Sequence, residues 1–144
     1  MGGQRGPAKP LPVPDPQSEG FWSSAARHVL ALQRCDSCGR IAHPPVTICP
    51  SCLSGEARFG FVPVGGRGRL MAWTVMRDAF LPAFRDDIPW VVGEAELDGA
   101  QGARLVARVD VAAETALARG VPIETVFEDV APGVALPVFR IPGS

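Results

Sequence analysis

The sequence predicts a mainly β protein in which an N-terminal helix leads into a zinc ribbon and then into a five- to six-stranded barrel of the OB type. Two closely spaced Cys-x-x-Cys pairs predict the ribbon, and an apolar period of two beyond them predicts the barrel strands. We expect three units: a disordered Pro-rich tail at 1–18, the helix with the ribbon at 19–58, and the barrel at 59–144.

The composition limits the classes to which the chain can belong. Its 144 residues, 47% hydrophobic and 20% charged, are typical of one ordinary globular domain or two very small ones. No apolar run is long enough for a transmembrane helix, and no secretory signal pattern opens the chain, so we expect a cytoplasmic protein without a membrane partner. Residues 27–69 carry six arginines against two acids, whereas 70–144 carry six against eleven. A phosphate-bearing ligand would therefore favour the basic half.

The first third of the chain changes character near Glu19. Residues 1–18 hold five prolines and no continuous apolar face, which predicts an extended, mobile tail or, alternatively, a polyproline ligand for a partner. After Ser18, a possible N-cap, apolar residues recur near helical spacing. This pattern predicts a helix of ten to thirteen residues that ends before Arg34.

Beyond Cys52 the apolar period of two predicts short strands separated by turns. Turns are expected at 98–102 and at Pro132-Gly133, and a single helical turn is expected at 114–119, ended by Gly120. The strands are expected at 58–64, 68–77, 90–97, 103–111, 121–130 and 136–141. The length left after the cysteines suits an OB-type barrel better than a full immunoglobulin-like sandwich.

The strongest motif is the pair of knuckles Cys35-x-x-Cys38 and Cys49-x-x-Cys52, separated by ten residues. Two such knuckles can place four thiolates at the corners of a tetrahedron around one Zn²⁺, and Gly39 follows the first knuckle where a positive φ is often required. Four protein ligands leave no position for substrate, so the zinc would be structural. A rubredoxin-type iron site uses the same ligands, and a redox dithiol is a third interpretation.

No catalytic set is visible in the remaining residues. His28 and His43 are the only histidines, and neither stands at knuckle spacing. His43 is expected beside the metal site or at the surface, and Asp86-Asp87 fits a solvated loop. We therefore expect no catalytic residues, and a protein that is not an enzyme by itself.

Several motifs occur together in an order that resembles a known family. They are Phe21-Trp22, Leu32-Gln33-Arg34-Cys35-Asp36-Ser37-Cys38-Gly39, Pro44-Pro45, Cys49-Pro50, Cys52, Gly66-Arg67-Gly68, Pro89 before Val91-Val92, Val126-Phe127-Glu128 and Leu136-Pro137-Val138-Phe139. Over residues 19–142 the chain resembles the OB-fold proteins with an N-terminal rubredoxin-like zinc ribbon, a domain of unknown function tied to acyl-CoA metabolism. The resemblance implies an accessory subunit that binds CoA or acyl-CoA and associates with thiolase-like enzymes, of acetyl-transferring or retro-aldol type, or with hot-dog-fold enoyl-CoA hydratases.

The family has no tight ligand motif, so ligand residues are inferred from chemistry. The phosphates of CoA favour arginine, and Arg40, Arg67 and Arg69 lie in the basic half, the last two flanking Gly68 where a ligand could approach the backbone. The apolar loop with Phe80, Leu81, Phe84 and Trp90 is expected to be a partner surface or acyl cover, with packing over the barrel mouth as the competing interpretation.

The alternative function is single-stranded nucleic-acid binding, a frequent use of OB barrels and zinc ribbons. Such binders combine a basic groove with exposed aromatic side chains on which bases stack. Here the barrel half is acidic and the chain contains no Tyr. We therefore favour the acyl-CoA accessory subunit and do not expect nucleic acid as a partner.

Overall fold

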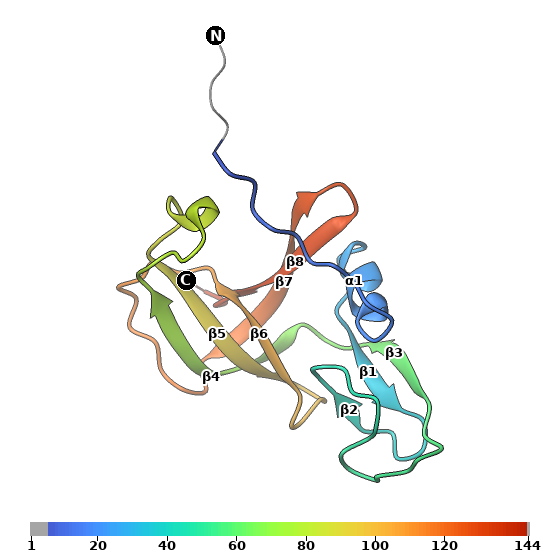
Figure 1. Cartoon of the computed structure of the whole chain (residues 1–144). Helices are drawn as coiled ribbons and strands as arrows, with labels where there is room; N and C mark the ends of the chain where they lie inside the picture. Colours follow the sequence, from blue (N-terminus) through green and yellow to red (C-terminus); the bar gives the residue numbers. More distant parts are fainter. Residues whose placement is uncertain (1–5, 144) are drawn as a thin grey trace.

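The computed structural model describes residues 6–143, and every structural statement below concerns these residues. The first five residues of the predicted 1–18 tail lie outside the described part. Figure 1 shows a small sheet next to a larger barrel, with one short helix, α1, beside the junction. The predicted class, a mainly β protein with one helix, a cysteine cluster and a barrel, is confirmed. No helix in this part of the chain has the length and apolar character needed to cross a membrane.

The helix α1 is shorter than predicted and spans Glu19–Ala25. It begins directly after Ser18, but the Ser18 hydroxyl does not cap it and instead donates to Asp15 Oδ1 at 2.7 Å. The chain leaves the helical path at His28, whose φ is 59°. The apolar Leu30 and Leu32, which suggested a longer helix, are buried outside the helix instead, Leu32 within a strand and Leu30 just before it. The helical prediction failed there because the segment pairs along its length with a strand distant in sequence, and this pairing overrides local periodicity.

The ribbon contains a three-stranded antiparallel sheet in the order β2-β1-β3. Its strands are β1 (Ala31–Cys35), β2 (Ile41–Ala42) and β3 (Phe59–Pro63). Most of the strand predicted at 58–64 falls within the predicted barrel unit, 59–144. The structure instead pairs it with β1, with Gln33 opposite Phe61. The chain therefore passes from ribbon to barrel after β3, between Pro63 and Arg67.

Five strands close into a barrel in the order β4-β5-β6-β8-β7. They are β4 (Arg67–Met76), β5 (Trp90–Leu97), β6 (Arg104–Val109), β7 (Pro122–Ala131) and β8 (Val134–Arg140). All pairs are antiparallel except β6 with β8, and β7 closes on β4 at Arg67–Arg69. Along β5 alternate residues from Val91 to Leu97 point into the core, as the period of two predicts.

The connections of the barrel match the predictions in part. The turns at 98–102 and at Pro132-Gly133 are present, and a short 3₁₀ helix, Pro82–Phe84, interrupts the loop between β4 and β5. The helical turn predicted at 114–119 is absent. This segment has few buried side chains that could stabilise a helix. The chain directly after it is bonded to β4, where Gly120 N–H donates to the Leu70 carbonyl at 2.7 Å.

Candidate functional site

The four cysteines form a compact cluster at one end of the ribbon. Their Sγ atoms all lie within 4.8 Å of one another. A zinc ion about 2.3 Å from each of four sulfurs would place the sulfurs about 3.8 Å apart. The structure has 3.8 Å between Sγ of Cys35 and Cys52 and 3.6 Å between Sγ of Cys38 and Cys49. The donor set and its spacing therefore fit one tetrahedral Zn²⁺ and suggest a structural zinc.

Each knuckle is held by a backbone hydrogen bond that turns the chain around the cluster. Gly39 N–H donates to the Cys35 carbonyl at 2.8 Å, and Leu53 N–H donates to the Cys49 carbonyl at 3.0 Å. The predicted positive φ at Gly39 is confirmed at 75°. At the corresponding place in the second knuckle Leu53 has a φ of 54°, which no sequence signal indicated because leucine rarely adopts this region.

The thiols respond unequally to their surroundings. Hydrogen bonds from the backbone N–H groups of Cys52 and Ser51 lower the pKa of the Cys49 thiol to about 6. At Cys52 the backbone N–H of Ser54 lowers the pKa, but desolvation and the three neighbouring thiols outweigh it and raise the pKa to about 11. One thiolate therefore forms readily, whereas four adjacent thiolates require a cation between them.

Two side chains brace the loop that carries the second knuckle. The amide of the buried Gln33 donates to the Val46 carbonyl at 2.9 Å and accepts from Val46 N–H at 2.7 Å. Asp36, inside the first knuckle, accepts from Arg58 N–H at 2.8 Å. These bonds tie one end of the loop to β1 and the other end to the first knuckle, which reduces the reorganisation needed on metal binding.

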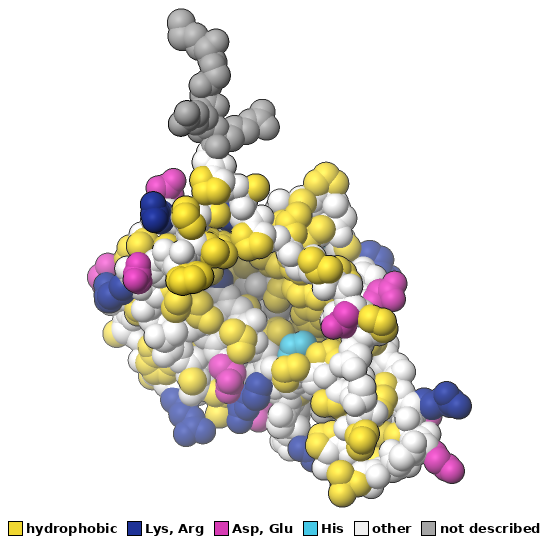
Figure 2. Space-filling view, in the orientation of Figure 1, with side chains coloured by type: hydrophobic (Ala, Val, Ile, Leu, Met, Phe, Trp, Pro, Cys, Tyr) yellow, Lys and Arg dark blue, Asp and Glu magenta, His cyan; other side chains and the backbone are white. Residues whose placement is uncertain are grey.

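A large groove lies where α1, the ribbon and the barrel meet. Its volume is about 650 Å³. Most of its wall is apolar, with contributions from Phe21, Trp22, Trp90, Val106, Leu136 and Val138. Figure 2 shows this hollow, walled by hydrophobic side chains with a histidine at its edge. A concave apolar site of this size is typical of small-molecule binding.

The charged groups along the groove are already paired with one another. Lys9 Nζ lies 2.6 Å from Asp87 Oδ2, and Arg108 Nη2 lies 2.6 Å from Glu128 Oε2. His43 faces Phe21 with the ring centroids 5.2 Å apart, and burial lowers the pKa of its imidazole, so the ring is neutral at neutral pH. Its Nδ1 is buried and has no hydrogen-bond partner within residues 6–143. The wall is therefore apolar with locally balanced charge.

The three predicted ligand arginines do not line this groove. Arg40 is exposed and lines a smaller cavity beside Cys35 and Cys49, with its guanidinium against Gly102. Arg67 and Arg69 are exposed on the outer face of β4, and Arg69 Nη1 donates to the Gly120 carbonyl at 3.0 Å. The space beside Gly68, expected for an approaching ligand, is filled by the Glu96 carbonyl and the Leu97 Cα.

The predicted partner surface divides into two parts. Phe80 is 97% exposed and Leu81 is 41% exposed, so both are available to another molecule. Phe84 and Trp90 are half-buried, stack on each other with centroids 5.8 Å apart, and line the groove. The loop thus forms one wall of the groove and presents an apolar tip beyond it.

Sequence reasoning missed the residues that form the groove from β6, β7 and β8. Val106 is 57% exposed although its neighbours on β6 alternate into the core. The sequence signal for Val106 is a large apolar residue at a strand position whose side chain should point away from the barrel core. Val130 on β7 repeats that signal, being 39% exposed on the wall of the same groove.

A rubredoxin-like zinc ribbon joined to an OB barrel defines a class of two-part proteins, and comparison with known families assigns the chain within it. The model of the ChsH2 rubredoxin-like zinc ribbon domain matches residues 22–57, and that of the ChsH2 C-terminal OB-fold domain matches residues 61–128. The chain belongs to this ChsH2 family, also known as DUF35.

Relatives and solved structures agree with this assignment. The solved Ltp2-ChsH2(DUF35) aldolase is similar with a TM-score of 0.77 and 30% identity, covering 90% of this chain and 98% of that one. A probable enoyl-CoA hydratase alpha subunit of Thermomonospora curvata is 34% identical over 83% of this chain, which spans only 36% of that protein. A DUF35 domain-containing scaffold protein of Methanothermobacter thermautotrophicus is 28% identical, covering 72% of this chain and 75% of the relative. The names of these relatives thus refer to an aldolase, to a hydratase subunit and to a scaffold protein.

Proposed function

We propose that the chain is a cytoplasmic, non-catalytic accessory subunit that binds CoA or acyl-CoA. It would dock on a thiolase-like acyltransferase or aldolase, or on a hot-dog-fold enoyl-CoA hydratase, and carry one structural Zn²⁺. The observation that carries this proposal is the apolar groove of about 650 Å³ between α1, the ribbon and the barrel. The names of the relatives, an aldolase, a hydratase subunit and scaffold proteins, support the choice of partner enzymes.

The shape and chemistry of the groove suit an acyl chain better than a nucleic acid. Its walls are mostly aliphatic and aromatic, and the rim cations Lys9 and Arg108 are each paired with a carboxylate. A strand-binding groove needs unpaired cations along a phosphate path. In the proposed arrangement the acyl group lies in the groove, and the phosphates of the nucleotide part contact the exposed arginines Arg40, Arg67 and Arg69 outside it.

Binding of the two halves of the ligand can be tested separately by calorimetry on the full chain. Val106→Gln should weaken acyl-CoA binding by about tenfold and leave CoA binding unchanged, because it removes apolar contact from the acyl group alone. Ile48→Gln is the matched control, since Ile48 is 60% exposed on the ribbon loop and does not line the groove. Arg67→Glu with Arg69→Glu should weaken CoA and acyl-CoA equally, by more than about tenfold.

Each arm of this experiment has an outcome that contradicts it. Equal acyl-CoA affinity in Val106→Gln would remove the acyl group from the groove. Equal affinity in the double arginine variant would move the phosphates elsewhere, and Arg40→Glu would then be the next variant. Tight oligonucleotide binding with a steep salt dependence would instead favour the single-stranded nucleic-acid alternative.

The exposed tip of the β4–β5 loop is the proposed docking anchor. Phe80→Asp should lower the affinity for the partner enzyme by about thirtyfold or more, the effect of losing an aromatic hot spot. The variant should then no longer co-elute with the enzyme. Because Phe80 is 97% exposed, zinc content and thermal unfolding should not change. Phe84→Asp would not test docking alone, since it also breaks the stack of Phe84 on Trp90 within the protein.

The control is Ile48→Asp, which places the same charge on another exposed apolar residue. Its complex should elute like that of the wild type. Undiminished binding of Phe80→Asp would place the docking surface elsewhere. If the wild-type chain eluted alone beside thiolase-like and hydratase candidates, the accessory role itself would be contradicted.

A further inference from the structure

Residues 9–18 form an extended segment, called the strap below, that runs from the β4–β5 loop to α1. Four of its ten residues are prolines, at 10, 12, 14 and 16, which preset an extended backbone. At the α1 end, Asp15 Oδ1 accepts from Ser18 N–H at 2.7 Å, and the Asp15 carbonyl accepts from Glu19 N–H at 2.9 Å. This turn fixes the point at which the strap leaves the helix (Figure 1).

The other end of the strap is held by a single side chain. Lys9 Nζ pairs with Asp87 Oδ2 at 2.6 Å and lies 5.7 Å from the centre of the Phe84 ring. Lys9, Phe84 and Asp87 all line the groove, as does Ser18 at the α1 end. The strap therefore borders the groove at both of its anchors. Within the described residues, no backbone hydrogen bond joins residues 9–14 of the strap to another element.

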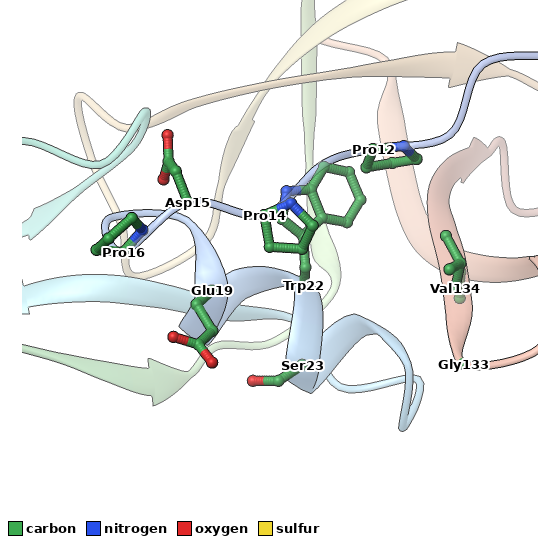
Figure 3. Close-up of a pocket in the computed structure, with 10 residues that line it drawn as sticks. Pro12, Pro14, Asp15, Pro16, Glu19, Trp22, Ser23, Gly133 and Val134 are labelled. Atoms are coloured by element: carbon green, nitrogen blue, oxygen red, sulfur yellow. The ribbon is translucent and has the colours of Figure 1, made fainter.

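A second cavity of about 450 Å³ lies along the middle of the strap. Pro12, Pro14 and Pro16 line it together with Trp22 and Val134. Figure 3 shows the Trp22 indole rising from α1 toward Pro14 and Pro12, with Val134 on the side of the β7–β8 hairpin. Trp22 also lines the groove, so the strap and this indole stand between two apolar spaces.

We propose that the strap is a gate at the edge of the groove, held in place by the Lys9–Asp87 ion pair, and that a ligand displaces it to fill the groove. The identity of the natural ligand rests on the proposed function, but the gate itself does not. The side chains of Lys9 and Asp87 are 52% and 36% exposed, so their ion pair is weak and readily exchanged for water. Displacing residues 9–14 breaks no backbone hydrogen bond to another element within the described chain and uncovers the side of Trp22 and Val134 that the prolines now face.

The gate predicts that breaking the ion pair raises the affinity of the groove for an uncharged apolar molecule. The apparent affinity of a gated site is its intrinsic affinity multiplied by the open fraction. Nile red, a neutral dye, should bind Lys9→Gln and Asp87→Asn up to about fivefold more tightly than the wild type, the limit set by an exposed ion pair. The double variant should bind no more tightly than the better single variant, because both remove the same contact.

Two controls separate the gate from general effects of charge and of the dye. Asp86→Asn removes the neighbouring carboxylate, which does not line the groove, and should bind Nile red like the wild type. Added salt should tighten dye binding to the wild type, since it screens the ion pair, and should not change binding to Asp87→Asn.

The outcomes also distinguish the gate from the proposed function. Dye binding that is equal, or weaker, in Lys9→Gln and Asp87→Asn would overturn the gate while leaving the groove as a ligand site. Dye that failed to bind any variant would overturn the gate and the proposed acyl site together.

Discussion

Replacing Cys49 with Ser should unfold the ribbon and abolish metal binding, the largest effect expected of any single substitution in this protein. Cys49 is 2% exposed, and its Sγ lies 3.6 Å from that of Cys38. Structural zinc sites of this kind contribute about 10 kcal/mol or more of apparent binding free energy to folding. Elemental analysis should find one zinc per wild-type chain and none in the variant. NMR should show the β1–β3 resonances of the variant collapsing while those of the barrel remain dispersed.

The control for this substitution lies inside the same knuckle. Ser51→Ala changes an exposed side chain between Cys49 and Cys52 and should retain its zinc and its fold. Four freely titratable thiols in the untreated wild type, or the absence of any metal, would contradict the structural zinc. Iron in place of zinc would favour the rubredoxin-type alternative with the same ligands.

Gly68→Ala should destabilise the barrel by about 3 kcal/mol, near the upper end for inserting a methyl group into a packed site. A Cβ at this position would meet the Glu96 carbonyl and lie 2.9 Å from the Leu97 Cα. Both are backbone atoms of β5, which is held in register with Gly68 opposite Leu97. Because neither can rotate away, β4 and β5 would have to separate where β4 also pairs with β7.

Denaturant unfolding measures this loss, and Gly60→Ala provides the comparison. Gly60 lies in β3 with no atom within 4 Å of an added Cβ, so alanine there should leave stability unchanged or raise it by less than about 1 kcal/mol. Equal stability of the two variants would show that the β4–β5 contact can relax.

The sequence by itself determined the parts of this protein whose physics is local. The spacing of Cys35, Cys38, Cys49 and Cys52 predicts two knuckles, because two thiolates with two residues between them can bind one ion only through a tight turn. The positive φ of Gly39 follows from that turn. The alternation along β5 and β6 predicts strands with one face in a core, since successive side chains point to opposite sides. The family resemblance then added the order of ribbon and barrel, which the comparisons confirm.

Only the tertiary structure decided which elements the remaining segments join. Leu30 and Leu32 both fit a helical period. Neither is helical, because β1 pairs with β3 from Ala31 onward and the Leu30 carbonyl accepts from Val64 N–H. Pairing with β1 likewise places Phe59–Pro63 in the ribbon sheet. Short apolar runs are locally ambiguous, because their conformation depends on partners tens of residues away.

The groove is the clearest case of a feature that the sequence did not reveal. Its walls come from Lys9 at one end of the chain, His43 in the ribbon and Val138 in the last strand. In the sequence, Lys9 is an ordinary tail residue, His43 an ordinary loop residue and Val138 an ordinary strand residue. They form a site only because α1, the ribbon and the barrel pack at one junction without filling it. Such a hollow is a property of how units fit together, and no local period or motif records it.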